Sequence, residues 1–123
     1  MDERAHDFAV LVRQLDGADV VSAYGELDLF TAPRLGAVLT GAGLRTGHDL
    51  VLDLAGLSSL DSIGIGTIDT ARRRCADDGG RTVLVVRPGS VVHRVLHILA
   101  LHQVMDIVPD LDAATRSLVR DPL

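Results

Sequence analysis

One stretch, residues 50–66, most strongly limits the folds open to this chain; it reads LVLDLAGLSSLDSIGIG. It opens with a nearly continuous apolar run, residues 50–54, without alternation of polar and apolar side chains. Such a strand is buried on both faces, which is typical of a central strand in an α/β sheet. Residues 55–60 then read as a loop, and Asp61 and Ser62 favour a helix N-cap. The stretch predicts a helix beginning just beyond a central strand, at the edge where α/β sheets usually bind.

Two glycines make this predicted helix start unusual. Gly64 and Gly66 fall in its first turn, where each is up to ~1 kcal/mol less favourable than alanine. One explanation is close packing of the helix on the strand. The other is that a second molecule approaches the backbone beside Ser62. The neighbouring Asp61–Ser62 pair favours the second explanation.

Composition restricts the classes of partner. The 123 residues are enough for one domain with its own core, and residues 1–7 read as a flexible lead. Two phenylalanines and one tyrosine are the only aromatic residues, which disfavours stacking on nucleic-acid bases. A net charge of -5 disfavours both nucleic-acid backbones and anionic membranes. We expect neither nucleic acid nor membrane as a partner.

Cysteine content and hydropathy indicate the compartment. Cys75 is the single cysteine, so no intramolecular disulfide can form, and its place on an apolar helix face predicts a buried structural thiol. No secretion signal opens the chain, and no apolar run approaches the length of a membrane span. We therefore expect a cytoplasmic protein.

The rest of the pattern alternates strands and helices. Strands at residues 8–14 and 19–24 flank Asp16-Gly17, a pair typical of hairpin turns. The helix that begins near Ser62 runs to about residue 78. Capping residues predict three further helices, and apolar runs predict two further strands; the helices begin at Thr31, Ser90 and Asp110, and the strands span residues 81–86 and 104–108. The order predicts a mostly parallel α/β sheet with an antiparallel N-terminal hairpin and about four helices.

Two details of these helices can be checked against the structure. The helix after Thr31 carries Pro33 in its first turn and ends at glycines 41 and 43. The helix after Ser90 has a predicted inward face of four apolar residues, which are Val92, Val95, Leu96 and Leu99.

Three enzyme-like or metal-binding readings compete for the functional residues. His93, His97 and His102 suggest zinc, but Arg94 stands where a zincin needs glutamate, and no second cysteine is available. Ser62 resembles a strand-to-helix nucleophile, but the flanking Gly-x-Ser-x-Gly pattern is absent. Gly64 and Gly66 match two glycines of a dinucleotide fingerprint, but Asp69 occupies the third position. We expect no metal, no cofactor and no catalytic residues.

Ser62 fits better as the substrate of another protein. Its hydroxyl is expected at a helix N-terminus beside two glycines, where a second active site can reach it. A phosphate there would be favoured by the helix dipole and the free N–H groups. It would also add about -1.5 to -2 charge next to Asp61, at a surface suited to contact. Phosphorylation is therefore expected to preserve the helix and disrupt an interface.

Several segments resemble a known family. Gly25-Glu26-Leu27-Asp28, Thr31-Ala32-Pro33, residues 52–54 (LDL) and residues 61–66 (DSIGIG) are similar to the STAS domain of bacterial anti-sigma factor antagonists. The similarity extends from about residue 8 to residue 119. It implies a STAS fold, with helices packed largely on one side of the sheet.

The resemblance also implies a regulatory cycle. An unphosphorylated antagonist of this family binds an anti-sigma factor that is also a serine kinase, which frees a sigma factor for transcription in stress response or sporulation. The kinase phosphorylates the serine of the Asp-Ser pair, here Ser62, and a serine phosphatase resets the cycle. The matching acidic residue of the early loop is Asp28. The residues implied in partner binding are Asp28, Asp61, Ser62, Ile63, Gly64, Ile65 and Gly66.

One departure from the family pattern keeps alternatives open. The position after the phosphorylated serine is often Ser or Thr in the family, and here it is Ile63. A STAS scaffold or ligand-sensing domain that is never phosphorylated is the alternative function. An enzyme with Ser62 as nucleophile is the third.

Overall fold

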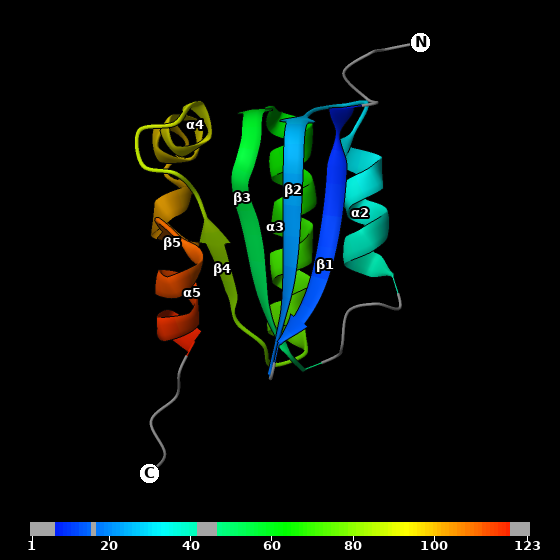
Figure 1. The fold of residues 1–123 in the computed structure, drawn as a ribbon, viewed down its shortest axis with the longest axis vertical. Coiled ribbons are helices and arrows are strands. Elements are labelled where there is room, and N and C mark those ends of the chain that lie inside the picture. Colours follow the sequence, from blue (N-terminus) through cyan, green and yellow to red (C-terminus); the bar gives the residue numbers. More distant parts are fainter. Residues whose placement is uncertain (1–6, 16, 42–46, 119–123) are drawn as a thin grey trace.

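The computed structural model describes residues 7–15, 17–41 and 47–118, and they form one layered α/β unit (Figure 1). The predicted turn residue Asp16, the predicted helix end at residue 43 and most of the expected lead lie outside this part. Five strands pair in the order β1-β2-β3-β4-β5. They are β1 (Ala9–Leu15), β2 (Ala18–Leu27), β3 (Asp49–Leu60), β4 (Thr82–Val85) and β5 (Asp106–Val108). β1 and β2 are antiparallel and the other pairs are parallel, which confirms the predicted sheet.

Four α-helices and one short 3-10 turn connect the strands in the described part of the chain. They are α2 (Ala32–Thr40), α3 (Ser62–Asp77), α4 (Val91–Ile98), η1 (Leu101–Gln103) and α5 (Leu111–Leu118). Ser90 caps α4, because its hydroxyl accepts a hydrogen bond from the N–H of His93 at 3.1 Å. Asp110 caps α5 in the same way through the N–H of Ala113 at 2.7 Å. Both predicted caps are confirmed.

The helices divide unequally between the two faces of the sheet. α2, α3 and α4 pack on one face, where Leu35, Ile68 and Leu96 join the larger apolar core. α5 packs on the other face, where Ala114 closes a smaller core with Val51 and Val83. Figure 1 is viewed from the α5 side. Three helices on one face and one on the other confirm the expectation of helices largely on one side.

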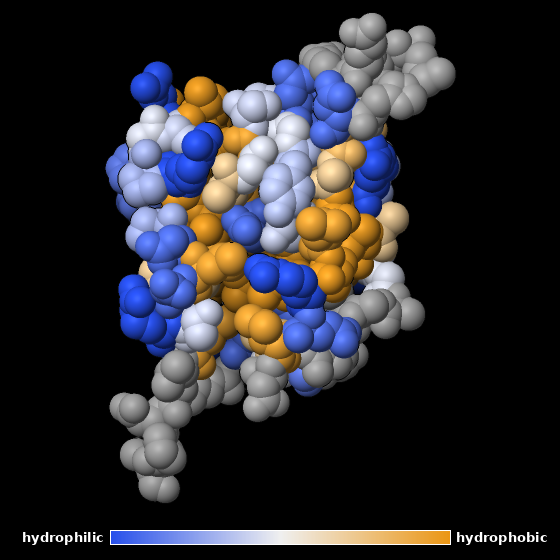
Figure 2. All heavy atoms as spheres, viewed as in Figure 1, coloured by the Kyte–Doolittle hydropathy of each residue, from blue (hydrophilic) through white to orange (hydrophobic). Residues whose placement is uncertain are grey.

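The α5 face leaves part of the sheet uncovered. Figure 2 shows apolar side chains gathered over the strands that α5 does not reach. Leu11 and Leu15 of β1 are exposed, whereas Val10 and Phe8, which precedes the strand, contact the larger core. Leu99 is also exposed, so its predicted inward position after α4 is wrong; α4 ends at Ile98, and Leu99 no longer follows the helical face.

The central strand is longer than predicted. Residues 55–60 were expected as a loop, but β3 continues to Leu60, where it pairs with Leu27 of β2. Glycine and serine are poor strand formers, which explains the error. The pairing of β2 with β3 is irregular at two places in this part of the sheet. Glycine is required at position 56, because a side chain there would collide with the ring of Tyr24. The extended pairing brings the end of β3 beside the loop that follows β2.

Candidate functional site

Asp61 lies where this extended strand becomes a helix. It is the N-cap of α3, and its Oδ1 accepts a hydrogen bond from the N–H of Gly64 at 2.9 Å. Its Oδ2 accepts a second one from the N–H of Leu29, in the loop after β2, at 3.1 Å. One carboxylate therefore begins the helix and ties the neighbouring loop to it.

Asp28 organises that loop. Its carboxylate accepts hydrogen bonds from the N–H groups of Phe30 and Thr31, at 2.9 Å and 3.1 Å. The hydroxyl of Thr31 donates to the carbonyl of Glu26 at 2.6 Å and makes no capping bond to α2. Thr31 occupies the predicted N-cap position, but its hydroxyl makes no capping bond because it is buried against the strand end and bonded to Glu26. Asp28 is therefore part of the loop that Asp61 holds through Leu29.

Ser62 is the first residue of α3, and its side chain is exposed. Its hydroxyl makes no hydrogen bond within the described residues, so it is available to a second molecule. The N–H groups of Ser62 and Ile63 belong to the first turn, where a helix has no acceptor of its own. Ser62 thus combines a free hydroxyl with an end of a helix that favours negative charge.

Exposed apolar side chains lie in the loop after β2 and in the first turn of α3, at the same edge as Ser62. Leu29 is 60% exposed, Phe30 56% and Ile63 48%. Leu29 is held beside α3 by its bond to Asp61. Sequence reasoning identified Ile63 but missed Leu29 and Phe30, although two apolar residues directly after a loop aspartate were a usable signal. Exposed apolar side chains beside a polar residue are typical of a protein-binding surface.

The remaining residues implied by the family resemblance differ in their surroundings. Gly64 is buried, and a Cβ there would lie 2.7 Å from Cγ of Leu27 and 2.9 Å from Cδ1 of Leu60. Gly66 is exposed, and a Cβ there would meet no heavy atom within 4 Å. Ile65 is half-buried against the larger core. The surroundings of the two glycines therefore differ. Gly64 is required for packing, and Gly66 is not.

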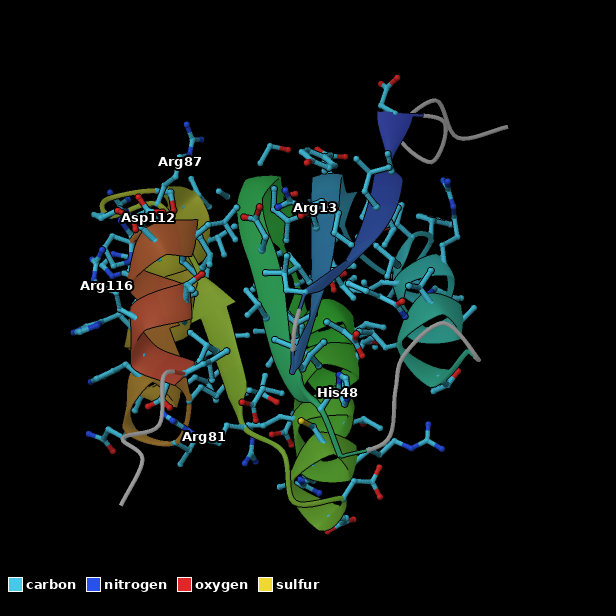
Figure 3. The ribbon with its side chains drawn as sticks, turned by 60° about the horizontal axis from the view of Figure 1, so that its bottom comes forward. Arg13, His48, Arg81, Arg87, Asp112 and Arg116 are labelled. Carbon is cyan, nitrogen blue, oxygen red and sulfur yellow. The ribbon has the colours of Figure 1, made fainter. Side chains whose placement is uncertain are left out.

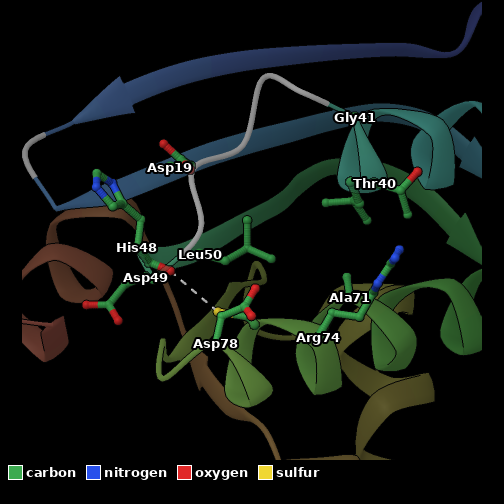
Figure 4. A pocket seen from close by; sticks show the side chains of 12 residues that line it. Asp19, Thr40, Gly41, His48, Asp49, Leu50, Ala71, Arg74 and Asp78 are labelled. Carbon is green, nitrogen blue, oxygen red and sulfur yellow. Dashed lines mark hydrogen bonds between the residues drawn. The ribbon is translucent and has the colours of Figure 1, made fainter.

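A polar cavity lies at the other end of the sheet. It has a volume of about 240 Å³ and is lined by residues that include Asp19, His48 and Asp49 (Figure 4). Figure 3 places His48 and Arg81 at this lower end, where β3 and β4 begin. The Sγ of Cys75 lies there too, 3.6 Å from the carbonyl oxygen of His48, and burial raises the pKa of this thiol. Cys75 is only half-buried, so the predicted buried thiol is confirmed in part.

The competing metal and nucleophile readings find no support in the geometry. The rings of His97 and His102 stack with centroids 4.0 Å apart and planes 10° apart, so their nitrogen lone pairs do not converge. No three His, Cys, Asp or Glu side chains in the described part of the chain are placed to hold a metal ion. No described histidine hydrogen-bonds the hydroxyl of Ser62. No helix in the same part has both the length and the apolar character needed to span a bilayer.

Comparison with known proteins identifies the family. The sequence-family model of the STAS domain matches residues 9–114, so the chain belongs to the STAS domain family. The fold is similar to that of an anti-sigma factor antagonist from Mycobacterium paratuberculosis, with a TM-score of 0.80 and 29% identity over 90% of this chain and 93% of that one. No protein of curated function matches the sequence significantly.

Two further solved structures show how widely the fold is used. SpoIIAA of Bacillus in its phosphorylated form has a TM-score of 0.65 and 24% identity over 89% of this chain and 99% of that one. The murine anion transporter Slc26a9 has a TM-score of 0.68 and 20% identity over 84% of this chain but only 18% of the transporter. At these identities the likeness concerns the fold alone.

Proposed function

We propose that this protein is an anti-sigma factor antagonist that is switched off by phosphorylation of Ser62. In the unphosphorylated state it binds an anti-sigma factor that is also a serine kinase, and the sigma factor is released. The kinase then transfers a phosphate to Ser62, and a serine phosphatase restores the binding state. The protein itself performs no catalysis and acts in the cytoplasm, on transcription in stress response or sporulation.

The observation that carries this proposal is the free hydroxyl of Ser62 beside exposed apolar side chains. Leu29, Phe30 and Ile63 are exposed at the same edge, and a kinase that reaches the hydroxyl would contact this edge. An anti-sigma factor antagonist is among the similar structures, which supports the partner class.

The local geometry supports the proposal that phosphorylation weakens binding of the partner and preserves the fold. A phosphate on Ser62 would find the N–H groups of Ser62 and Ile63 at the start of α3, so the fold would tolerate it. The carboxylate of Asp61 is adjacent and already occupied by Gly64 and Leu29. A contact with the partner would therefore have to desolvate two neighbouring negative groups, which is unfavourable.

The test is transfer of phosphate from ATP by each anti-sigma serine kinase of the same genome, followed by intact-mass and peptide mass spectrometry. We expect one phosphate, on Ser62, and none on the Ser62→Ala variant. Ser58→Ala is the matched control, because Ser58 is also an exposed serine of this edge, with its hydroxyl donating to the carbonyl of Gly25. Absence of phosphate with every kinase, or full phosphorylation of Ser62→Ala, would refute the proposal.

A second candidate is a scaffold or ligand-sensing STAS domain that is never phosphorylated. The polar cavity of about 240 Å³ at the far end of the sheet favours it (Figure 4). The phosphorylation experiment separates the two candidates, since only the first requires phosphate on Ser62.

A further inference from the structure

A groove runs between α2 and α3 and begins beside Ser62. Its volume is about 430 Å³, within the ~300–1,000 Å³ of binding clefts. Leu39 of α2 and Ile63 and Ala71 of α3 give it mainly apolar walls. The groove and the polar cavity share Thr40, Ala71 and Arg74, and Figure 4, which draws the cavity, shows Ala71 and Arg74 of α3 across from Thr40 of α2.

Four residues of α3 follow the groove from end to end. They are Ser62, Gly66, Thr70 and Arg74, and their four-residue spacing places them in one row along the helix. A rise of ~1.5 Å per residue gives the row a length of about 18 Å. That length corresponds to about three turns of a second helix laid along it.

The glycines of the groove are not explained by the packing of this chain. A Cβ on Gly66 would meet nothing within 4 Å, and one on Gly36 of α2 would meet only Cγ2 of Thr67 at an ordinary 3.7 Å. Neither residue has a positive φ. Glycine inside a helix is destabilising relative to alanine, and close approach of another backbone is a reason to retain it.

Arg74 differs in its ion pairing from the two arginines that precede it. Arg72 and Arg73 both bind the carboxylate of Asp69, at 2.8 Å and 2.9 Å. Arg74 lines the groove at the point where it meets the polar cavity, whose walls include Asp49 and Asp78. None of the ion pairs among the described residues includes the guanidinium of Arg74. An arginine at the end of an apolar groove is suited to a carboxylate brought by the occupant.

We propose that this groove docks an amphipathic helix of the kinase that acts on Ser62, and that a carboxylate of that helix pairs with Arg74. The inference rests on the proposed function and adds a second contact region, distinct from the phosphorylated residue. A helix is the occupant that fits, because the groove is elongated and bounded by two helices, and because it continues into the exposed apolar edge beside Ser62. Helix-in-groove binding uses such apolar walls for affinity.

The test uses the kinase that phosphorylates Ser62 and measures its Kd and the steady-state kinetics of phosphate transfer. Gly66→Leu fills the groove and Arg74→Gln removes its charge. The matched controls are Ala76→Leu, the same added bulk at an exposed position of α3, and Arg73→Gln, the same loss of charge outside the groove. Thermal unfolding verifies that all four variants fold.

We expect Gly66→Leu and Arg74→Gln to raise Kd at least tenfold and the controls to stay within twofold. KM of phosphate transfer should rise with Kd while kcat stays within twofold, since the groove positions the kinase and does not touch the transferred phosphate. Unchanged Kd in both groove variants would overturn the inference and leave the proposed function intact. Absence of phosphate on Ser62 with every kinase would refute both the proposed function and the inference about the groove.

A small apolar acid is the competing occupant. Titration with decanoate tests for such an acid through the amide shifts of α2 and α3. If these shifts change and the groove variants leave kinase binding unchanged, the groove binds small apolar acids and the proposal is overturned.

Discussion

The carboxylate of Asp61 connects two segments that are far apart in the sequence. It caps α3 through Gly64 and holds the loop after β2 through Leu29. Ser62, the next residue, makes no comparable contact in the described structure. Two adjacent residues that both favour helix caps therefore have separate roles, one structural and one available to a partner.

Substitution of these two residues separates the roles. Asp61→Ala should lower the free energy of unfolding by ~1–2 kcal/mol, because a cap is lost. Ser62→Ala should change it by less than ~0.5 kcal/mol, since an exposed hydroxyl without a bond is removed. Urea denaturation measures both, and an equal loss in the two variants would contradict the assignment of the cap to Asp61.

The two glycines of the first turn form a second matched pair. Gly64→Ala should destabilise the protein by ~1–3 kcal/mol, because its Cβ would press on Leu27 and Leu60. Gly66→Ala should be neutral or stabilising by up to ~1 kcal/mol, because the space beside it is open. Thermal and chemical unfolding of the two variants test this, and similar behaviour of both would be inconsistent with the described packing.

At the scale of the element, α3 is a helix whose N-terminus carries the candidate switch and whose body is anchored independently. Ile68 and Ala71 are buried against the sheet. The first-turn N–H groups of Ser62 and Ile63 are suited to an added negative charge. A phosphate should therefore alter the surface at this end and leave the helix in place.

Ser62→Glu tests this local mechanism. Binding of the kinase should weaken by ~30- to 4000-fold, the equivalent of the ~2–5 kcal/mol typical of a mismatched interfacial charge. The circular dichroism spectrum should not change, and backbone amide shifts should be confined to the loop after β2 and the start of α3. Ser58→Glu serves as the control with the same added charge. Shift changes across the whole sheet would indicate a conformational switch instead.

In the whole molecule, Asp61 follows the end of β3 and His48 of the polar cavity precedes its start, so the site and the cavity lie at opposite ends of the sheet. The sheet also divides the core into two parts. The larger part lies under α2, α3 and α4, and the smaller part depends on α5 alone. Stability of the second face should therefore be sensitive to a single helix.

Ala114→Asp tests that dependence. Ala114 is fully buried in the smaller core, so an unpaired carboxylate there should lower the free energy of unfolding by ~3–5 kcal/mol. Thr115→Asp, at an exposed position of the same helix, should have an effect within ~0.5 kcal/mol. Chemical denaturation compares the two. If both lose the same stability, α5 does not close the second core.

Features that arise from interactions within a few residues could be predicted from the sequence alone. The N-caps at Asp61, Ser90 and Asp110 each satisfy the N–H group three positions ahead. The sequence predicted the last two directly and narrowed the first to Asp61 or Ser62. The apolar run at residues 50–54 likewise predicted two-sided burial, because an uninterrupted apolar pattern has no face for solvent.

Features that depend on partners distant in the sequence could not be predicted and follow from the assembled fold. The continuation of β3 to Leu60 needs β2 as its pairing strand, and the buried position of Thr31 reflects contacts beyond its own helix. Gly64 and Gly66 are indistinguishable in the sequence, yet Leu27 lies against one and open space beside the other. The groove between α2 and α3 exists only because the sheet holds two separate helices side by side. Burial and pairing across some thirty residues are properties of the assembled fold, and no local pattern encodes them.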